Sequence, residues 1–189
     1  GVNDTTSLIF IFLQFAFGCT SGFSVITAKH VGLNDEKGVR RSFAAQIYLS
    51  VIISAILTAL SILLLPTLLG FINVTPANKE VYDAAYIYCF IIFLGIFTQM
   101  GYNFICGILR AYGDSVTPLI FLVISTALNV ALDILFLSVF RMGPAGAAIA
   151  TVITQLLSMI GCFCYTVIKY KALRLTGEDF KASLKDLVP

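Results

Sequence analysis

Long apolar runs recur along the whole chain, with short polar segments between them. Five of these runs are roughly 20 residues long or longer, enough for an α-helix to cross the hydrocarbon core of a bilayer. They cover residues 6–28, 43–65, 82–109, 119–140 and 145–168. The segments between them, such as "KHVGLNDEKGVRR" and "RAYGDSVTP", carry charges, glycines or prolines. Because backbone polar groups in lipid must be bonded internally, the pattern predicts five transmembrane helices.

The composition also indicates a membrane protein. Of the 189 residues, 59% are hydrophobic and only 12% are charged, whereas soluble domains are nearer half apolar and a quarter charged. The net charge is +2, without a basic patch interleaved with aromatics, so the expected partner is the lipid bilayer and not nucleic acid. We therefore predict an all-α integral membrane protein, with a helical bundle over residues 1–170 and an amphipathic tail over residues 171–189.

Basic residues are distributed unevenly between the two predicted sides of the membrane. Ten of the twelve follow the first, third and fifth spans: Lys29, Lys37, Arg40, Arg41, Arg110, Lys169, Lys171, Arg174, Lys181 and Lys185. Because basic loops stay in the cytoplasm, we expect a cytoplasmic tail and an extracytoplasmic N-terminus in a multi-pass protein of the cell membrane. A chain that starts outside, at Gly1, is expected to be a fragment that a further span precedes.

Polar side chains inside the predicted spans are the candidate functional residues, because such groups are costly in lipid. The fourth span places an amide and a carboxyl four residues apart, at Asn129 and Asp133 in "STALNVALDILF". Burial favours the neutral form of Asp133, whereas a nearby cation favours its ionised form. Together with Thr151, this pair offers the hard oxygen ligands that suit Na⁺. The pattern therefore indicates a carboxyl that binds either H⁺ or Na⁺.

Further polar side chains are expected to face the same interior cavity. Residues four apart share one face of a helix, so each of three spans presents a pair of polar side chains. The pairs are Gln99 and Asn103, Ser125 and Asn129, and Thr151 and Gln155. If the three faces converge, they enclose one cavity around the single carboxyl of Asp133.

Several of these positions also have a purely structural interpretation. Asp133 could be a carboxylate hydrogen-bonded across helices, or paired with an arginine outside this sequence. Small and hydroxylated residues favour close helix packing. On that ground the pair Gly18 and Gly22 is expected at a helix contact, as is a polar stripe along the second span: Gln46, Ser50, Ser54 and Thr58. The five cysteines lack CxxC spacing and are expected to be packing residues.

The segments "ILRAYGDSVTP", "NVALD" and "GPAGAAIATVITQ" together resemble the multidrug and toxic compound extrusion (MATE) transporters. The resemblance runs from about Phe17 to Gln155, although Lys29 and His30 replace the residues usual in the first cytoplasmic loop. It implies that the five spans are helices two to six of a six-helix N-terminal lobe. The first helix of that lobe, with its acidic residue, and the C-terminal lobe would then be missing.

This resemblance also implies a function and a set of site residues. It implies a secondary active transporter that exports organic, often cationic, drugs or toxins in exchange for H⁺ or Na⁺, and not an enzyme. In the family, an Asn–Asp pair in helix five contributes to the cation site, and Asn129 and Asp133 match that pair. Asn103 and Thr151 match the contributing positions in helices four and six. Gln99, Gln155 and Ser125 are candidates for the substrate cavity, and no cofactor is expected.

Other functions remain open from the sequence. A related flippase for lipid-linked oligosaccharides would need a large basic cavity, yet the predicted spans hold no lysine or arginine away from their ends. A membrane scaffold without transport activity gives no reason for Asp133. An intramembrane enzyme is disfavoured because the one histidine, His30, falls in a loop and no nucleophile–base pair is visible.

Overall fold

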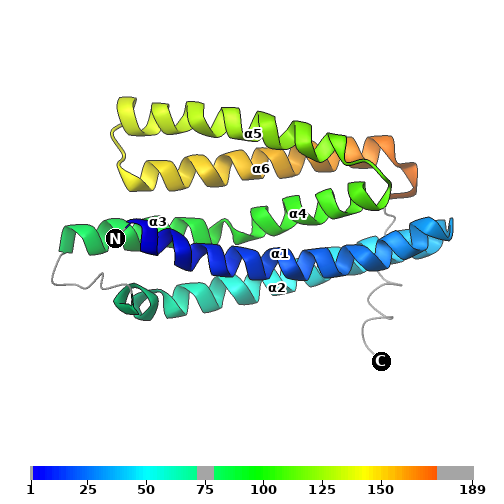
Figure 1. The fold of residues 1–189 in the computed structure, drawn as a ribbon, viewed down its shortest axis with the longest axis horizontal. Coiled ribbons are helices and arrows are strands. Elements are labelled where there is room, and N and C mark those ends of the chain that lie inside the picture. The colour runs from blue at the N-terminus through cyan, green and yellow to red at the C-terminus, as the bar shows by residue number, and fades with distance from the viewer. Residues whose placement is uncertain (1, 72–78, 174–189) are drawn as a thin grey trace.

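The computed structural model describes residues 2–71 and 79–173, and over these ranges the chain folds into a bundle of α-helices without a β-strand. Helices α5 and α6 lie along one side of the bundle, α3 and α4 lie in the middle, and α1 and α2 lie along the other side (Figure 1). The six α-helices are α1 Val2–Gly32, α2 Glu36–Phe71, α3 Lys79–Leu94, α4 Ile96–Ala111, α5 Val116–Ile134 and α6 Pro144–Lys169. The predicted all-α class is confirmed for these residues.

Four of the five predicted spans correspond to helices of the structure. Residues 6–28 fall in α1, 43–65 in α2 and 145–168 in α6, while 119–140 covers α5 and the π-helical turn Leu135–Val139. Within the described ranges, α2, α5 with its π-helical turn, and α6 are each long and apolar enough to cross a membrane alone. At 1.5 Å per residue, the 36 residues of α2 extend about 54 Å, well beyond a bilayer core.

The third predicted span, 82–109, is wrong as one continuous helix. It is broken at Gly95 into α3 and α4, which bend by 40° and can together count as a fourth span. A Cβ atom on Gly95 would lie 2.6 Å from Cγ2 of Val152, so glycine lets α6 approach at the break. The hydroxyl of Thr58 donates to the carbonyl oxygen of Phe93 at 3.1 Å. The polar stripe of α2 therefore supports the backbone at the bend.

Two apolar clusters hold the bundle together, one near each end of α4. The first joins α2, α3, the start of α4 and α6 through Leu57, Leu65, Leu69, Cys89, Ile92, Phe93, Ile96, Met100 and Ala148. The second joins α2, the end of α4, α6 and a short 3₁₀ helix through Val39, Phe43, Phe104, Ile105, Ile108, Leu109, Cys162 and Leu173. Because lipid is as apolar as these side chains, close packing contributes more to this contact than exclusion of water.

The packing interpretation of the polar stripe on α2 agrees with the structure in part. Gln46 is 2% exposed and donates to the hydroxyl of Thr27 on α1, which is itself bonded to Ser42 at 3.0 Å. This chain of bonds links α1 to α2. The contact predicted at Gly18 and Gly22 is not seen among the described atoms, because a Cβ added at either glycine would meet none of them within 4 Å.

An ion pair links the α4–α5 loop to the end of α6. Nζ of Lys169 lies 2.6 Å from Oδ2 of Asp114, and also over the rings of Tyr165 and Tyr170, at 5.2 and 5.4 Å from their centroids. Asp114 accepts two further hydrogen bonds from Thr117, one from its backbone N–H and one from its hydroxyl. The bond from Lys169 and then the backbone N–H of Thr117 lower the pKa of Asp114 to about 2.

The chain beyond α6 is described only through the 3₁₀ helix Lys171–Leu173. Leu173 is 1% exposed within the second apolar cluster, and Tyr170 stacks on Tyr112 with their ring centroids 4.2 Å apart. The start of the predicted tail therefore packs onto the bundle. The rest of the tail predicted over 171–189 lies outside the described residues.

The Asp114 carboxyl predicts a specific acid dependence of stability. A carboxyl whose pKa is lowered by folding stabilises the fold above its unfolded pKa of about 3.9 and ceases to do so as the pH falls through its folded pKa. We expect the free energy of unfolding at neutral pH to be higher for wild type than for Asp114→Asn. This difference in free energy should shrink as the pH falls from about 4 to about 2. Denaturant titration of both proteins across this range measures it.

The Lys169→Met background provides the control. Because the ion pair is then already lost, Asp114→Asn should cause a smaller further change in stability. If Asp114→Asn has the same effect with and without Lys169, the ion pair does not stabilise the bundle.

Candidate functional site

The candidate residues of α5 lie on the one stripe of that helix that another helix covers. Helix α5 packs mainly against α6, and within its described residues only Thr117 is fully buried. A half-buried stripe nevertheless recurs every three to four residues: Pro118, Phe121, Ser125, Leu128, Asn129, Leu132, Asp133 and Phe136. The α5–α6 contact therefore positions Ser125, Asn129 and Asp133.

Small residues of α6 let α5 approach closely. Gly146, Ala148 and Ala150 are buried, as the run of small residues predicted. A Cβ on Gly161 would lie 2.9 Å from the ring of Phe121, and one on Gly146 would lie 3.0 Å from Cβ of Phe136. Glycines thus accommodate an aromatic residue of α5 and one of the π-helical turn that follows it, on either side of the candidate site, which fixes the register of α5 against α6.

Asn129 and Thr151 meet across this contact. Nδ2 of Asn129 donates to Oγ1 of Thr151 at 3.4 Å, and the Thr151 hydroxyl donates to the carbonyl oxygen of Ala147 at 3.0 Å. The hydrogen of Thr151 is thereby used on its own helix, so its oxygen acts as the acceptor between helices. Because this bond uses the amide nitrogen of Asn129 as donor, the carbonyl oxygen of the same side chain remains available to bind a cation.

Asp133 lies one turn beyond Asn129, next to the end of α5. Its Oδ1 atom is shielded from solvent and has no hydrogen-bond partner among the described residues. The π-helical turn Leu135–Val139 begins two residues later, and such turns are frequent at functional sites. A buried acceptor without a partner needs a proton or a cation to compensate its desolvation.

The candidates on α4 and later on α6 are not bonded to this pair. Nδ2 of Asn103 is buried without a partner, so no hydrogen bond from that atom reaches Asn129, Asp133 or Thr151 among the described residues. Gln155 instead lies near the break between α3 and α4, where the hydroxyl of Thr98 is 3.5 Å from its Oε1 atom. Of the polar side chains expected to converge on one cavity, only Asn129 and Thr151 are joined by a hydrogen bond in the described structure.

Gln99 and Ser125 are half-buried positions, consistent with either a cavity wall or a packing face. Gln99 and Asn103 share one face of α4, almost opposite the face that carries Gly101, since two residues correspond to about 200° of helical rotation. Thr98, which lies near Gln155, repeats no polar spacing that would single it out in the sequence.

The donor set suits a hard cation better than a transition metal. No group of three or more histidine, cysteine, aspartate or glutamate side chains that could hold a metal ion occurs among the described residues. Asp133 offers a carboxylate oxygen, Asn129 a carbonyl oxygen and Thr151 a hydroxyl oxygen, which are ligands of the kind that hard cations take.

Comparison with known proteins gives consistent relatives. A protein-family model described as MatE matches residues 1–135. The chain is 36% identical over 167 residues to the probable multidrug resistance protein YpnP of Bacillus subtilis, covering 88% of the chain and 37% of that protein. It is 26% identical over 185 residues to the probable multidrug resistance protein NorM of Thermotoga maritima, covering 93% and 38%. The chain therefore spans little more than a third of the length of either relative.

Solved structures share the fold over nearly the whole chain. A crystal structure of a MATE protein with a single proline-to-alanine change gives a TM-score of 0.83 at 24% identity and covers 99% of this chain and 42% of its own. An outward-facing multidrug resistance MATE transporter gives a TM-score of 0.79 at 25% identity and covers 97% of this chain and 42% of its own. An inward-facing one gives 0.75 at 23% identity, covering 92% and 41%. The expected fold, part of a MATE-type lobe, is confirmed.

The unpartnered carboxyl of Asp133 predicts a gain in stability when it is removed. Leucine has a similar size and leaves no buried polar atom, so we expect Asp133→Leu to raise the free energy of unfolding by about 1–3 kcal/mol in detergent without Na⁺. Asp114→Leu is the matched control and should lower it, because that carboxylate has partners. Equal destabilisation by both changes would show that Asp133 is a structural carboxylate.

Proposed function

Because this chain belongs to the MatE family, we propose that it is part of a secondary active transporter that exports drug-like organic molecules, often cations, in exchange for H⁺ or Na⁺. Its role on this proposal is transport and not catalysis. The relatives are named as probable multidrug resistance proteins. The observation that carries the proposal is the buried, unpartnered Oδ1 atom of Asp133.

Asp133 is the proposed coupling residue. In a conformation that shields it, the carboxyl is stable only when it is protonated or bound to Na⁺. In a conformation that opens it to water, the cation can leave. A cation shifts the equilibrium between two conformations only if it binds one of them more tightly. A carboxyl that is shielded in one conformation and open to water in the other provides such a difference in affinity.

Asn129 and Thr151 are proposed to bring the cation to the helix contact. The bond between them crosses from α5 to α6, so an ion that takes the Asn129 carbonyl oxygen or the Thr151 hydroxyl oxygen acts on both helices. Val152, the neighbour of Thr151, fills the space at Gly95 where α3 and α4 bend. Cation binding at Thr151 is thereby connected to the bend between α3 and α4. A bend of this kind can act as a hinge between two conformations.

The substrate proposal rests on charge. The predicted spans contain no lysine or arginine away from their ends, so this part of the transporter offers no counterion to a phosphate. That favours organic cations and neutral amphiphiles over the pyrophosphate of a lipid-linked oligosaccharide. Gln99, Asn103, Ser125 and Gln155 are the proposed polar contacts to the substrate. The basic end of the bundle, around Arg110 and Lys169, is proposed to face the cytoplasm.

The test is counterflow of a fluorescent organic cation in vesicles that hold the full-length transporter. Asp133→Asn should abolish the dependence of the transport rate on a Na⁺ or H⁺ gradient, because the amide takes up neither a proton nor Na⁺ as the carboxyl does. Asp83→Asn makes the same chemical change at an exposed position of α3 and should transport like wild type. Wild-type coupled rates in Asp133→Asn at equal expression would refute the role.

A further inference from the structure

The bend between α3 and α4 arises without a proline. Sharp bends in helices usually occur at proline, at glycine–serine pairs, at π-bulges or where a side chain enters the backbone hydrogen bonds. No proline occurs in residues 79–111, yet α3 and α4 meet at 40°. The N–H of Gly95 still donates to the carbonyl oxygen of Ile91 at 3.1 Å, and the N–H of Gln99 to that of Gly95 at 3.2 Å. Some helical hydrogen bonding thus continues across the bend.

Two threonine hydroxyls bond backbone carbonyls at this bend. Oγ1 of Thr98, in the first turn of α4, donates to the carbonyl oxygen of Gly95 at 2.7 Å, an oxygen that also accepts from Gln99. A threonine bonded back to its own helix often bends that helix. Oγ1 of Thr58 on α2 donates to the carbonyl oxygen of Phe93 at 3.1 Å. The backbone at the bend is therefore held by side chains and can be rearranged with them.

The Thr98 hydroxyl has a second acceptor within reach. Oε1 of Gln155 on α6 lies 3.5 Å away, beyond the distance of about 3.0 Å that limits most hydrogen bonds between two oxygens. A hydroxyl has one hydrogen, which in this structure bonds Gly95. Donation to Gln155 would take one of two donors from the Gly95 carbonyl and join α4 to α6. Because one neutral hydrogen bond would replace another, the two arrangements are close in free energy.

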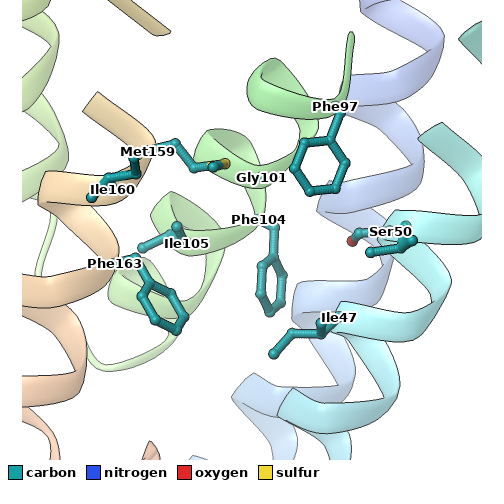
Figure 2. A pocket seen from close by; sticks show the side chains of 10 residues that line it. Ile47, Ser50, Phe97, Gly101, Phe104, Ile105, Met159, Ile160 and Phe163 are labelled. Atoms are coloured by element: carbon teal, nitrogen blue, oxygen red, sulfur yellow. The ribbon is translucent and has the colours of Figure 1, made fainter. Parts of the chain in front are cut away.

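Helix α4 is held against α6 on the far side of the bend. Figure 2 shows the side chain of Met159 on α6 directed toward Gly101, where a Cβ would lie 2.3 Å from the methionine sulfur. Beyond the end of α4, the ring of Tyr112 stacks on that of Tyr170 with centroids 4.2 Å apart. A change of the bend would therefore move α3 and leave α4 in place.

Helix α3 is packed most tightly next to the bend. Its fully buried residues are Cys89, Ile92 and Phe93, all within its last six positions. Residues 79–88 are exposed or half-buried in the described structure. Regions with few buried apolar contacts are the ones that move at low cost. The far end of α3 is thus the part of this helix that the bundle restrains least.

We propose that the break at Gly95 is a hinge between α3 and α4, and that Thr98 sets its angle by donating either to Gly95 or to Gln155. Gly95 is the pivot because a Cβ there would lie 2.6 Å from Cγ2 of Val152 on α6. Thr98 acts through the Gly95 carbonyl and is a positioning residue. The inference goes beyond the proposed coupling residue, since the hinge uses no atom of Asp133.

The test measures the distance between two nitroxide labels in the full-length transporter, in lipid vesicles and with native cysteines replaced. The labels stand at the exposed positions Val81 and Val139, at the end of the bundle where α3 begins and α5 ends (Figure 1). The 16 residues of α3 extend about 24 Å, so a change of about 10° in the bend moves its far end by about 4 Å. We therefore expect two distances about 4 Å apart in wild type.

Three substitutions assign these distances to the two hydrogen bonds. Thr98→Val removes the hydroxyl and should keep only the distance of the relaxed bend. Gln155→Leu removes the second acceptor and should keep only the distance of the bent form. Thr98→Ser retains the hydroxyl and should keep both distances. The same distance distribution in wild type, Thr98→Val and Gln155→Leu would overturn the proposal.

A second pair of variants covers the case in which Thr98→Val perturbs the fold. Alanine is ordinarily the better helix former, but Gly95→Ala should displace α3 and change both distances, because its Cβ meets Val152. Adding Val152→Ala should restore them; a double variant no closer to wild type would overturn the pivot. Asp133→Asn should keep the response to Thr98→Val. Loss of that response would overturn the role of Thr98, while the proposed coupling role of Asp133 would stand.

Discussion

One carboxyl oxygen of the bundle is held away from water without a hydrogen-bond partner among the described residues. Oδ1 of Asp133 is buried and unbonded on a helix that, among the described elements, packs mainly against α6. Small residues on α6 make that contact close and bring Asn129 within 3.4 Å of Thr151. An unpaired buried carboxyl destabilises the bundle, as strained functional sites commonly do. A cation bound to Asp133 would compensate the desolvation of this oxygen, which no described residue does.

Helix α4 divides the bundle into two chemically different sides. One face carries Gln99 and Asn103, and the nearly opposite face carries Gly101, which Met159 of α6 contacts closely. The break at Gly95 begins this helix, and Val152 of α6 fills the space that the glycine leaves.

The sequence predicts well what depends on periodicity and composition. Apolar runs gave the helices, small residues at the start of α6 gave the close contact with α5, and the spacing of Asn129 and Asp133 placed both on its covered stripe. The break at Gly95 was missed because a single glycine in an apolar run does not distinguish a bend from an uninterrupted helix. That Gln155 lies near Thr98 could not be predicted, because a helical face does not specify which neighbour it meets.

The most direct measurement is the infrared difference spectrum produced by adding Na⁺, or by lowering the pH, to protein whose aspartates carry ¹³C in the side-chain carboxyl. The account predicts that an isotope-shifted carboxyl band changes on cation binding, and that the band is absent from Asp133→Asn but present in Asp83→Asn. Identical difference spectra for wild type and Asp133→Asn would show that the cation binds elsewhere, and would contradict the account.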